Sequence, residues 1–354
     1  MRRDLIPIAV CISTFAGVAS AAVAQEKPWW PISLNDATTA PAKISDYTPL
    51  AKASKVWKIC VLFPHMKDSF WNAVDYGVVE EARREGVSVA IYEAGGYDQL
   101  PKQLSQFDDC IASGSDAIVL GAISEAGLKQ KLSETAAAGK PVIAIANPVG
   151  DAPAAGKIYG EFTATGGLTG TELLTSLAGK PAQVVTFPGP QGSGWAEALN
   201  DGFLNKIKGT QIKVLDQKFG DTGVGVQLKL VEDALQTYPD LNVIWGTAPT
   251  AEAAIGAVVE AGRPGIAILA SYENQAMLDA VKKGDILGFA TNYPVLSGRI
   301  GVDMAVRVLE GKKAITTATS IPQFVTKASL GKINLDLVLA PPSWKPVYSV
   351  KAGQ

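Results

Sequence analysis

From residue 57 onward, short runs of apolar residues alternate with longer stretches in which apolar residues recur at helical spacing. The runs predict strands at residues 59–63, 87–92, 117–120 and 142–146, and the stretches between them predict helices at 69–84, 100–112 and 128–138. Strands that are apolar throughout are typical of parallel sheets covered by helices on both faces. This half of the chain therefore predicts a doubly wound α/β lobe.

A second series of the same kind begins after residues 148–153, where prolines and a glycine break the periodicity and predict a hinge. Its predicted strands are 184–187, 213–219, 243–245, 266–271 and 286–291, and its predicted helices are 168–177, 196–207, 226–238, 251–261 and 276–283. Residues 292–294 precede a last helix at 296–309, and we expect them to cross back to the first lobe. The pattern predicts two doubly wound parallel-sheet lobes joined by a multi-strand hinge, with ligands at the carboxyl ends of the strands.

The two ends of the chain complete this division. Residues 1–24 predict a signal peptide, because a basic start and an apolar run at 5–18 are followed by Ala22-Val23-Ala24, an A-x-A cleavage pattern. We therefore expect a mature chain that starts at Gln25 and lies in the periplasm. The expected divisions are an extended N-terminal arm at 25–55, a first lobe at 56–150 plus 294–313, a second lobe at 151–293 plus 314–330, and a tail at 331–354 that packs on the lobes.

Composition and charge agree with a folded binding protein of two lobes. A chain of 354 residues suits two lobes of roughly 120 to 150 residues each. Hydrophobic residues make up 47% and charged residues 19%, which is typical of globular proteins. The net charge is -2, and basic and acidic residues are interspersed along the whole chain. This distribution argues against a nucleic-acid partner.

The cysteines leave two interpretations open. Cys11 lies in the predicted signal peptide, so the mature chain keeps only Cys60 and Cys110. In an oxidising compartment these two residues predict a disulfide, which would close a loop of about 50 residues and contribute roughly 4 kcal/mol. Two buried thiols are the alternative, because the sequence does not show whether the two Cα atoms approach each other.

Aromatic and polar residues follow several of the predicted strands, at the ends that converge between the lobes. These residues are Asp68, Phe70, Trp71, Tyr97 and Asn147 in the first lobe and Trp195 and Tyr272 in the second. Taken alone, Asp68 could cap a helix and Trp71 could pack in the core. Aromatic faces attract quaternary ammonium groups by roughly 0.5 to 2 kcal/mol each. The set therefore predicts a site for a cationic or methyl-rich ligand, since a sugar would need more Asp, Asn and Arg partners.

An enzymatic function has little support in the sequence. His65 is the only histidine, which excludes a Ser-His pair or a two-His metal site. We interpret His65 as a solvated loop residue. The glycine-rich residues 189–194 match neither a P-loop nor a G-x-G-x-x-G motif and predict a tight turn into a helix. We expect no catalysis, no metal and no cofactor.

Several segments together match one known family. They are Trp57-Lys58-Ile59-Cys60, Lys67-Asp68-Ser69-Phe70-Trp71, Glu80-Glu81-Ala82-Arg83-Arg84, Glu93-Ala94-Gly95-Gly96-Tyr97, Cys110, Gly246-Thr247-Ala248, Ala251-Glu252-Ala253-Ala254 and Lys345-Pro346-Val347-Tyr348. Through them the chain resembles the type I periplasmic binding proteins that bind trimethylamine N-oxide and report it to a membrane-bound sensor kinase. The resemblance runs from about residue 57 to 311 and is densest in the first lobe. It implies a two-lobed binding protein whose partners are a small ligand and the periplasmic domain of a histidine kinase.

The same resemblance implies an aromatic box around the ligand. Asp68, Phe70 and Trp71 match an Asp-x-Tyr-Trp loop of the family and Tyr97 matches a Gly-Gly-Tyr motif. Phe162 and Tyr272 lie near other positions of the box.

The sequence departs from the family at two positions. Phe70 stands in place of a tyrosine and Phe162 in place of a tryptophan, so two hydrogen-bond donors are lost. Trp195, Asn147 and Asn292 are candidates to supply donors instead, because an unpaired ligand oxygen would cost roughly 1 to 3 kcal/mol. The alternative is the substrate-binding component of an ABC transporter for a sugar or another small polar solute.

Overall fold

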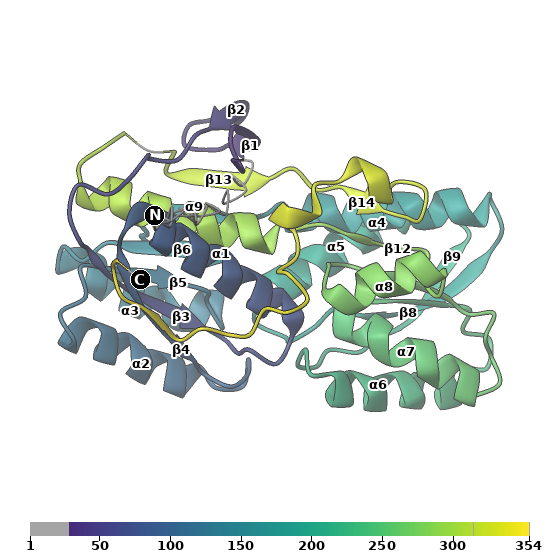
Figure 1. The fold of residues 1–354 in the computed structure, drawn as a ribbon. Coiled ribbons are helices and arrows are strands. Elements are labelled where there is room, and N and C mark those ends of the chain that lie inside the picture. Colours follow the sequence, from purple (N-terminus) through teal and green to yellow (C-terminus); the bar gives the residue numbers. More distant parts are fainter. Residues whose placement is uncertain (1–27, 314, 354) are drawn as a thin grey trace, which may run out of the picture.

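The computed structural model describes residues 28–313 and 315–353, which form two α/β lobes side by side (Figure 1). The strands of the first lobe are β1 (Ile32–Asp36), β2 (Lys43–Tyr47), β3 (Lys58–Phe63), β4 (Ser88–Glu93), β5 (Ala117–Leu120), β6 (Val142–Ala146), β7 (Gly156–Gly160), β13 (Thr317–Ser320) and β15 (Ser349–Val350). The strands of the second lobe are β8 (Ala182–Phe187), β9 (Ile212–Gln217), β10 (Val243–Gly246), β11 (Ala267–Ala270), β12 (Gly288–Ala290) and β14 (Phe324–Val325).

Each lobe is built on one sheet. The nine-stranded sheet has the order β15-β4-β3-β5-β6-β7-β13-β1-β2, and the six-stranded sheet has the order β14-β12-β11-β10-β8-β9. The central strands of both sheets pair in parallel. The antiparallel pairs of the described residues lie toward the sheet edges and are β1–β2, β1–β13, β12–β14 and β4–β15. β5 and β6 are buried along their whole length, as continuous apolar strands between two helical layers should be. The expected fold class is confirmed.

Helices cover both faces of each sheet. In the first lobe, α1 (Ser69–Glu85) and α9 (Pro294–Leu309) pack together on one face, while α2 (Leu100–Ala112) and α3 (Glu125–Ala137) lie on the other (Figure 1). In the second lobe, α4 (Phe162–Leu177) and α5 (Trp195–Ile207) cover one face, and α6 (Val224–Thr237), α7 (Ala248–Glu260) and α8 (Gln275–Lys283) cover the other. The loops that follow the parallel strands are thereby directed to the junction of the lobes.

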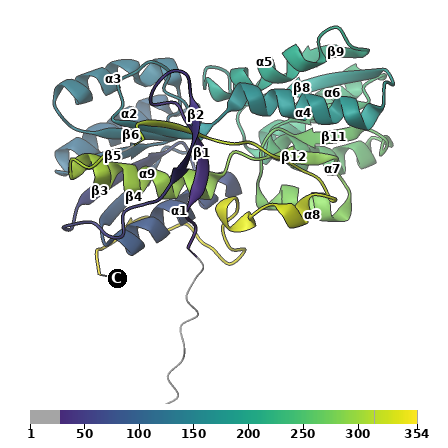
Figure 2. The same cartoon turned by 90° about the horizontal axis from the view of Figure 1, so that it is seen from above.

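Three crossings between the lobes precede the C-terminal tail, and the first lies later than the sequence predicts. Residues 151–293 plus 314–330 were expected in the second lobe, but β7 and β13 pair with each other in the first sheet. The loop at 148–153 is therefore a turn between β6 and β7, and the crossings are β7 to α4, β12 to α9 and β13 to β14 (Figure 2). β7 and β13 are short and contain small or polar residues, so their apolar signal is weak.

The N-terminal arm is more regular than the expected extended segment. β1 and β2 form an antiparallel hairpin, and β1 pairs with β13 at the edge of the first sheet. The expected signal peptide and its cleavage site lie outside the described residues. The hairpin is part of the first lobe because its backbone groups continue the hydrogen-bonding pattern of the sheet.

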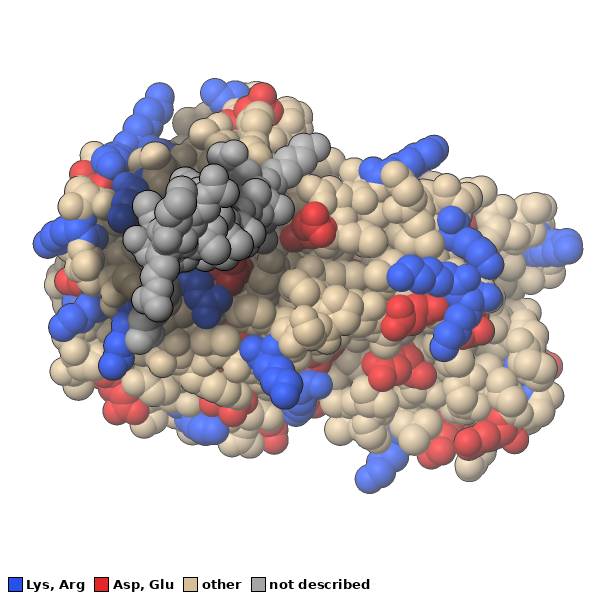
Figure 3. Space-filling view, in the orientation of Figure 1, with Lys and Arg blue, Asp and Glu red and all other residues tan. Residues whose placement is uncertain are grey.

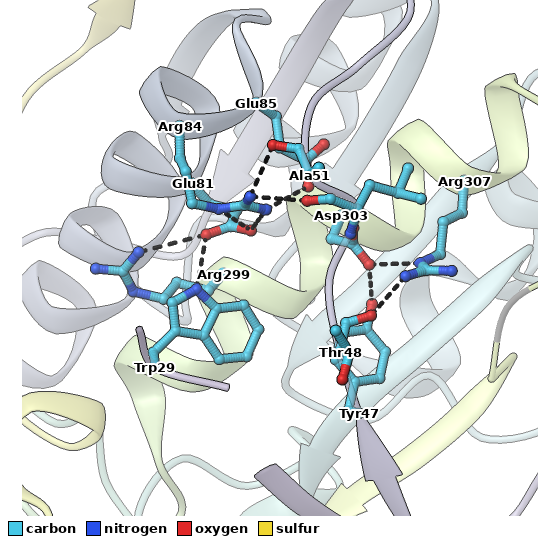
Figure 4. A network of polar contacts seen from close by, with 11 residues as sticks. Trp29, Tyr47, Thr48, Ala51, Glu81, Arg84, Glu85, Arg299, Asp303 and Arg307 are labelled. Atoms are coloured by element: carbon cyan, nitrogen blue, oxygen red, sulfur yellow. Dashed lines mark hydrogen bonds and ion pairs between the residues drawn. The ribbon is translucent and has the colours of Figure 1, made fainter. Parts of the chain in front are cut away.

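A buried cluster of carboxylates and arginines attaches the arm to α1 and α9 (Figure 4). Glu81 of α1 accepts a hydrogen bond from the indole of Trp29 at 3.1 Å. Asp303 of α9 accepts one from the hydroxyl of Tyr47 and pairs with Arg307 at 2.6 Å. A buried carboxylate is stable only when hydrogen-bond donors surround it. The arm supplies one such donor to Glu81 and one to Asp303.

The C-terminal tail runs from the second lobe back to the first. After β14 it forms two short turns, η1 (Leu330–Lys332) and η2 (Leu335–Leu337), and then contributes β15, which pairs with β4. Between these elements, Asp75 of α1 accepts hydrogen bonds from the Trp344 indole at 2.9 Å and from the Val347 backbone at 3.0 Å. The tail is thus fixed to the first lobe.

Two surface properties of the described residues bear on possible partners. None of the described helices combines the length and the apolar character needed to cross a membrane. On the face shown in Figure 3, basic and acidic side chains are interspersed over both lobes. A nucleic-acid-binding surface would instead gather basic side chains.

Cys60 and Cys110 form a disulfide, which decides between the two interpretations of the cysteines. It links β3 to α2, and the two Cα atoms are 5.7 Å apart. Both residues lie in the apolar core beneath α2 and α3. The bond therefore closes a loop of 50 residues within the first lobe.

We predict that Cys110→Ser lowers the free energy of unfolding of the purified protein by about 4 kcal/mol, because the reduced chain regains the entropy of the opened loop. Urea unfolding followed by circular dichroism measures this difference. Reductant should bring the wild-type protein to the stability of the variant. Equal stability of oxidised wild type and variant would contradict the prediction.

Candidate ligand-binding site

One cavity between the lobes contains all of the residues that the sequence singled out as a site. About 350 Å³ of space between protein atoms lies within it, part of it open to solvent. Its lining consists of Asp68, Phe70, Trp71, Tyr97, Ala146, Asn147, Phe162, Trp195, Leu199, Thr222, Tyr272 and Asn292. The sequence did not indicate Ala146, Leu199 and Thr222.

The lining residues come from the strand ends and helix starts of both lobes. Phe70 and Trp71 begin α1, and Phe162 and Trp195 begin α4 and α5. The Trp71 ring lies against Gly121, where an added Cβ would come within 2.4 Å of it. A glycine after β5 is therefore needed for the indole to pack at this place.

Aromatic rings form a continuous wall across the junction of the lobes. The Phe70 and Tyr272 ring centroids are 5.4 Å apart, and those of Tyr97 and Trp195 are 5.8 Å apart, so each pair joins the two lobes. Trp195 and Tyr272 are 5.9 Å apart within the second lobe. Edge and tilted arrangements of this kind are the favoured geometries of aromatic pairs. The wall presents ring faces and edges to a ligand from both sides.

Asp68 is the carboxylate of the cavity and joins the lobes. It caps α1 by accepting from the Phe70 backbone at 3.2 Å, and it accepts from the Tyr272 hydroxyl at 3.0 Å and from the Asn274 amide at 3.2 Å. Burial raises the pKa of Asp68, and these three hydrogen bonds oppose that rise. Among the described residues, no lysine or arginine forms an ion pair with Asp68.

The opposite part of the lining offers hydrogen-bond donors. Asn147 donates to the Tyr97 hydroxyl at 2.9 Å and to the Ala122 carbonyl at 2.7 Å. Because the hydroxyl oxygen accepts from Asn147, its own hydrogen is free to point elsewhere. Burial raises the pKa of Tyr97, so this hydrogen stays in place. The buried indole N–H of Trp195 has no acceptor among the described residues.

Further contacts between the lobes surround the cavity. The ring of His65 bonds to the Thr222 hydroxyl at 2.9 Å, and Lys67 pairs with Asp221 at 2.7 Å. The interpretation of His65 as a solvated residue is wrong, since it is 1% exposed. Burial lowers the pKa of His65 to about 4, so the ring is neutral near pH 7. The structure is therefore that of a closed cleft.

Two polar residues that the sequence analysis did not select, Thr222 and Asn274, also lie beyond strand ends. Thr222 follows β9, and Asn274 follows β11 and caps α8. The rule that ligands lie beyond strand ends covers both positions, but neither residue is aromatic or charged. Their polar side chains are common in loops, so only their partners in the other lobe distinguish them.

The described part of the chain offers no metal-binding group of three or more His, Cys, Asp or Glu side chains. What the cavity contains instead is one carboxylate, a wall of aromatic rings and two donors without acceptors. This combination is suited to binding a small ligand with a positive and an oxygen-bearing part.

A comparison with known protein families identifies the family to which this two-lobed chain belongs. Residues 59–313 match the periplasmic binding protein domain. The chain belongs to the periplasmic binding protein family.

Two individual relatives show how similar this chain is to particular binding proteins. Periplasmic protein TorT of Escherichia coli (strain K12) is 32% identical over 304 residues, which are 85% of this chain and 86% of TorT. The ribose import binding protein RbsB of Bacillus subtilis (strain 168) is 23% identical over 257 residues, 72% of this chain and 82% of RbsB.

Two solved structures are similar along nearly the whole fold. An ABC transporter solute-binding protein from Bradyrhizobium sp. BTAi1 with bound bis-tris is 44% identical, with a TM-score of 0.76 over 91% of this chain and 99% of that chain. The complex of the TorS sensor domain with TorT, in the absence of ligand, matches with 26% identity and a TM-score of 0.75 over 82% of this chain and 100% of that chain.

We predict that Tyr272→Phe shifts the ligand-free protein toward open lobes, because Asp68 loses a donor from the other lobe. A hydrogen bond to a charged group contributes about 1.5 to 3 kcal/mol. Small-angle X-ray scattering should show a larger radius of gyration than for the wild type.

Tyr238→Phe is the matched control, because its hydroxyl donates to Asp216 at 2.9 Å within the second lobe. This variant should scatter like the wild type. An unchanged radius for Tyr272→Phe, or an equal change for both variants, would show that Asp68 does not hold the lobes together.

Proposed function

We propose that the protein is a periplasmic receptor that captures trimethylamine N-oxide or a related small methylated amine between its lobes and signals to a membrane histidine kinase. The observation that carries this proposal is the pairing of an aromatic wall with Asp68, a buried carboxylate that has no cation beside it in the described structure. The family membership supports a binding function.

The first requirement of such a ligand is a positive, methyl-covered nitrogen. Aromatic rings attract such a group by roughly 0.5 to 2 kcal/mol each without needing hydroxyl partners. Asp68 adds an anion on the same wall, at the rings of Phe70 and Tyr272. A bound cation would offset the cost of burying this carboxylate. The Bradyrhizobium protein was solved with bound bis-tris, which carries a tertiary amine and also five hydroxyl groups.

The second requirement is an acceptor oxygen. The Tyr97 hydroxyl and the Trp195 indole both have a hydrogen to donate. Tyr97 is the donor that the family motif retains, and Trp195 is a candidate to supply a donor in place of those lost at Phe70 and Phe162. An N-oxide carries its oxygen directly on the methylated nitrogen, so one small molecule satisfies both requirements.

The signalling role is supported by the relatives. TorT is similar over 85% of this chain, and it has been solved in complex with the TorS sensor domain. The second candidate is transport, because the 44% identical protein is an ABC transporter solute-binding protein. Both roles use the same closure around a ligand. A sensor-kinase gene beside this gene would favour signalling, and permease and ATPase genes would favour transport.

Ribose is the ligand that best separates the proposal from sugar binding. A sugar needs several carboxylate, amide or guanidinium partners, and the described lining contains no arginine. Its carboxylate, Asp68, already accepts three hydrogen bonds. The other polar groups of the lining, among them Asn147, Thr222 and Asn292, are uncharged.

Isothermal titration calorimetry of the purified protein tests the ligand class with trimethylamine N-oxide, trimethylamine, betaine and ribose. We expect binding of the N-oxide and no heat with ribose. Heat with ribose and none with the methylated compounds would contradict the proposal and support sugar transport.

The double variant Trp71→Ala/Tyr272→Ala locates the binding in the cavity, and we expect it to lose at least about tenfold in affinity for the N-oxide. Trp57→Ala/Tyr238→Ala is the control, because both rings lie outside the lining. Unchanged affinity of the first variant would contradict the site.

A further inference from the structure

Glu273 is a buried carboxylate that contacts the chain crossing between β12 and α9. It is 0% exposed and follows Tyr272 of the cavity. One of its oxygens accepts from the backbone N–H groups of Asn292 and Tyr293, both at 2.7 Å. Its other oxygen accepts from the Asn292 backbone at 3.0 Å and from the Asn292 side-chain amide at 3.4 Å. All of these donors belong to the crossing.

Asn292 is the point where the three crossings meet at the cavity. Its side chain lines the cavity, and its Oδ1 has no partner among the described residues. The first crossing approaches it at Gly160, where an added Cβ would lie 2.3 Å from that oxygen. The third crossing contacts it through Ser320, whose hydroxyl donates to the Asn292 carbonyl at 3.2 Å. A residue that fixes Asn292 therefore acts on all three crossings.

The next residue shows that the crossing is held away from its relaxed backbone conformation. Tyr293 has φ 57° and ψ 60°, in the left-handed region that favours glycine, and it precedes the first turn of α9. Such a conformation persists only where surrounding contacts enforce it. Two short hydrogen bonds from adjacent backbone N–H groups to one carboxylate oxygen are contacts of this kind.

We propose that Glu273 is a positioning residue that holds the Asn292–Tyr293 crossing in its closed-cleft conformation and directs the Asn292 side chain to the cavity wall. Its link to ligand affinity rests on the function proposed above. The neighbours of Glu273 complete the connection, because Tyr272 and Asn274 both donate to Asp68 of the first lobe. Tyr272 and Asn274 thus contact the first lobe across the closed cleft, and Glu273 between them contacts the crossing.

Burial gives this contact a pH dependence. It raises the pKa of Glu273 to about 7, although the N–H donors of the crossing oppose the rise. If opening of the contact exposes Glu273 to water, its pKa returns toward the ordinary value. The closed contact therefore binds the proton more tightly and is lost as pH rises through about 7.

Few other titratable groups face Glu273. Tyr293 faces it from the crossing, and burial together with the charge of Glu273 raises the pKa of that phenol. Asp68 lies beyond Tyr272 and Asn274, and burial raises its pKa as well. A measurement confined to the backbone amides of the crossing therefore distinguishes the titration of Glu273 from that of Asp68.

Amide hydrogen exchange of the ligand-free protein provides that readout. In Glu273→Ala we expect the backbone amides of Asn292 and Tyr293 to exchange at least about tenfold faster than in the wild type. Asp75→Asn is the matched control, because this buried carboxylate accepts the Val347 amide at 3.0 Å and should alter exchange there alone. Unchanged exchange at Asn292 and Tyr293 in Glu273→Ala would overturn the proposal.

The pH profile distinguishes a charged contact from a merely structural one. After correction for intrinsic rates, we expect protection of these two amides in the wild type to fall by about tenfold or more between pH 5 and pH 8. Glu273→Gln, which mimics the protonated acid, should abolish this fall. The wild-type profile tests the proposal even where a variant fails to fold, since a flat profile would overturn it.

Calorimetry with trimethylamine N-oxide extends the test to the ligand. We expect Glu273→Ala to bind at least about tenfold more weakly than the wild type, and Asp75→Asn to bind as the wild type does. Equal affinity of Glu273→Ala and wild type would overturn the role of Glu273 in binding while leaving the proposed function intact. Absence of wild-type binding would contradict the proposed function, and amide exchange would still decide whether Glu273 holds the crossing.

Discussion

The closed structure depends on a carboxylate buried where the two lobes meet. Asp68 caps the first helix of one lobe and accepts hydrogen bonds from Tyr272 and Asn274 of the other. A buried charge must be satisfied by donors, and here two of the donors are present only when the cleft is closed. The same carboxylate belongs to the lining of the cavity. One residue therefore contributes both to the closure of the cleft and to the electrostatics of the cavity.

The loop from Tyr272 to Asn274 connects that carboxylate to the hinge. Its first and last residues donate to Asp68, while Glu273 between them accepts from the crossing at Asn292. A ligand that changes the position of the loop therefore acts both on the contact with Asp68 and on the crossing at Asn292.

Much of this arrangement could be predicted from the sequence, because strand ends of doubly wound sheets converge at one place. The seven residues selected on that basis lie around a single cavity, together with Phe162 and Asn292, which the family resemblance brought in. The position of the first crossing could not be predicted, since β7 and β13 are short strands whose pairing joins residues far apart in the chain. Burial of His65 depends on Thr222 of the other lobe, and the arm is held by Glu81 and Asp303, so these features follow only from tertiary contacts.

The central claim is that a methylated amine oxide binds between the lobes against Asp68 and the aromatic wall. A crystal structure of the protein grown with trimethylamine N-oxide tests this most directly. The account predicts ligand density in the cavity, with methyl groups against Trp71 and Tyr272 and the oxygen within hydrogen-bond distance of Tyr97 or Trp195. A closed cleft that contains only water at saturating ligand, or an N-oxide bound elsewhere, would contradict it.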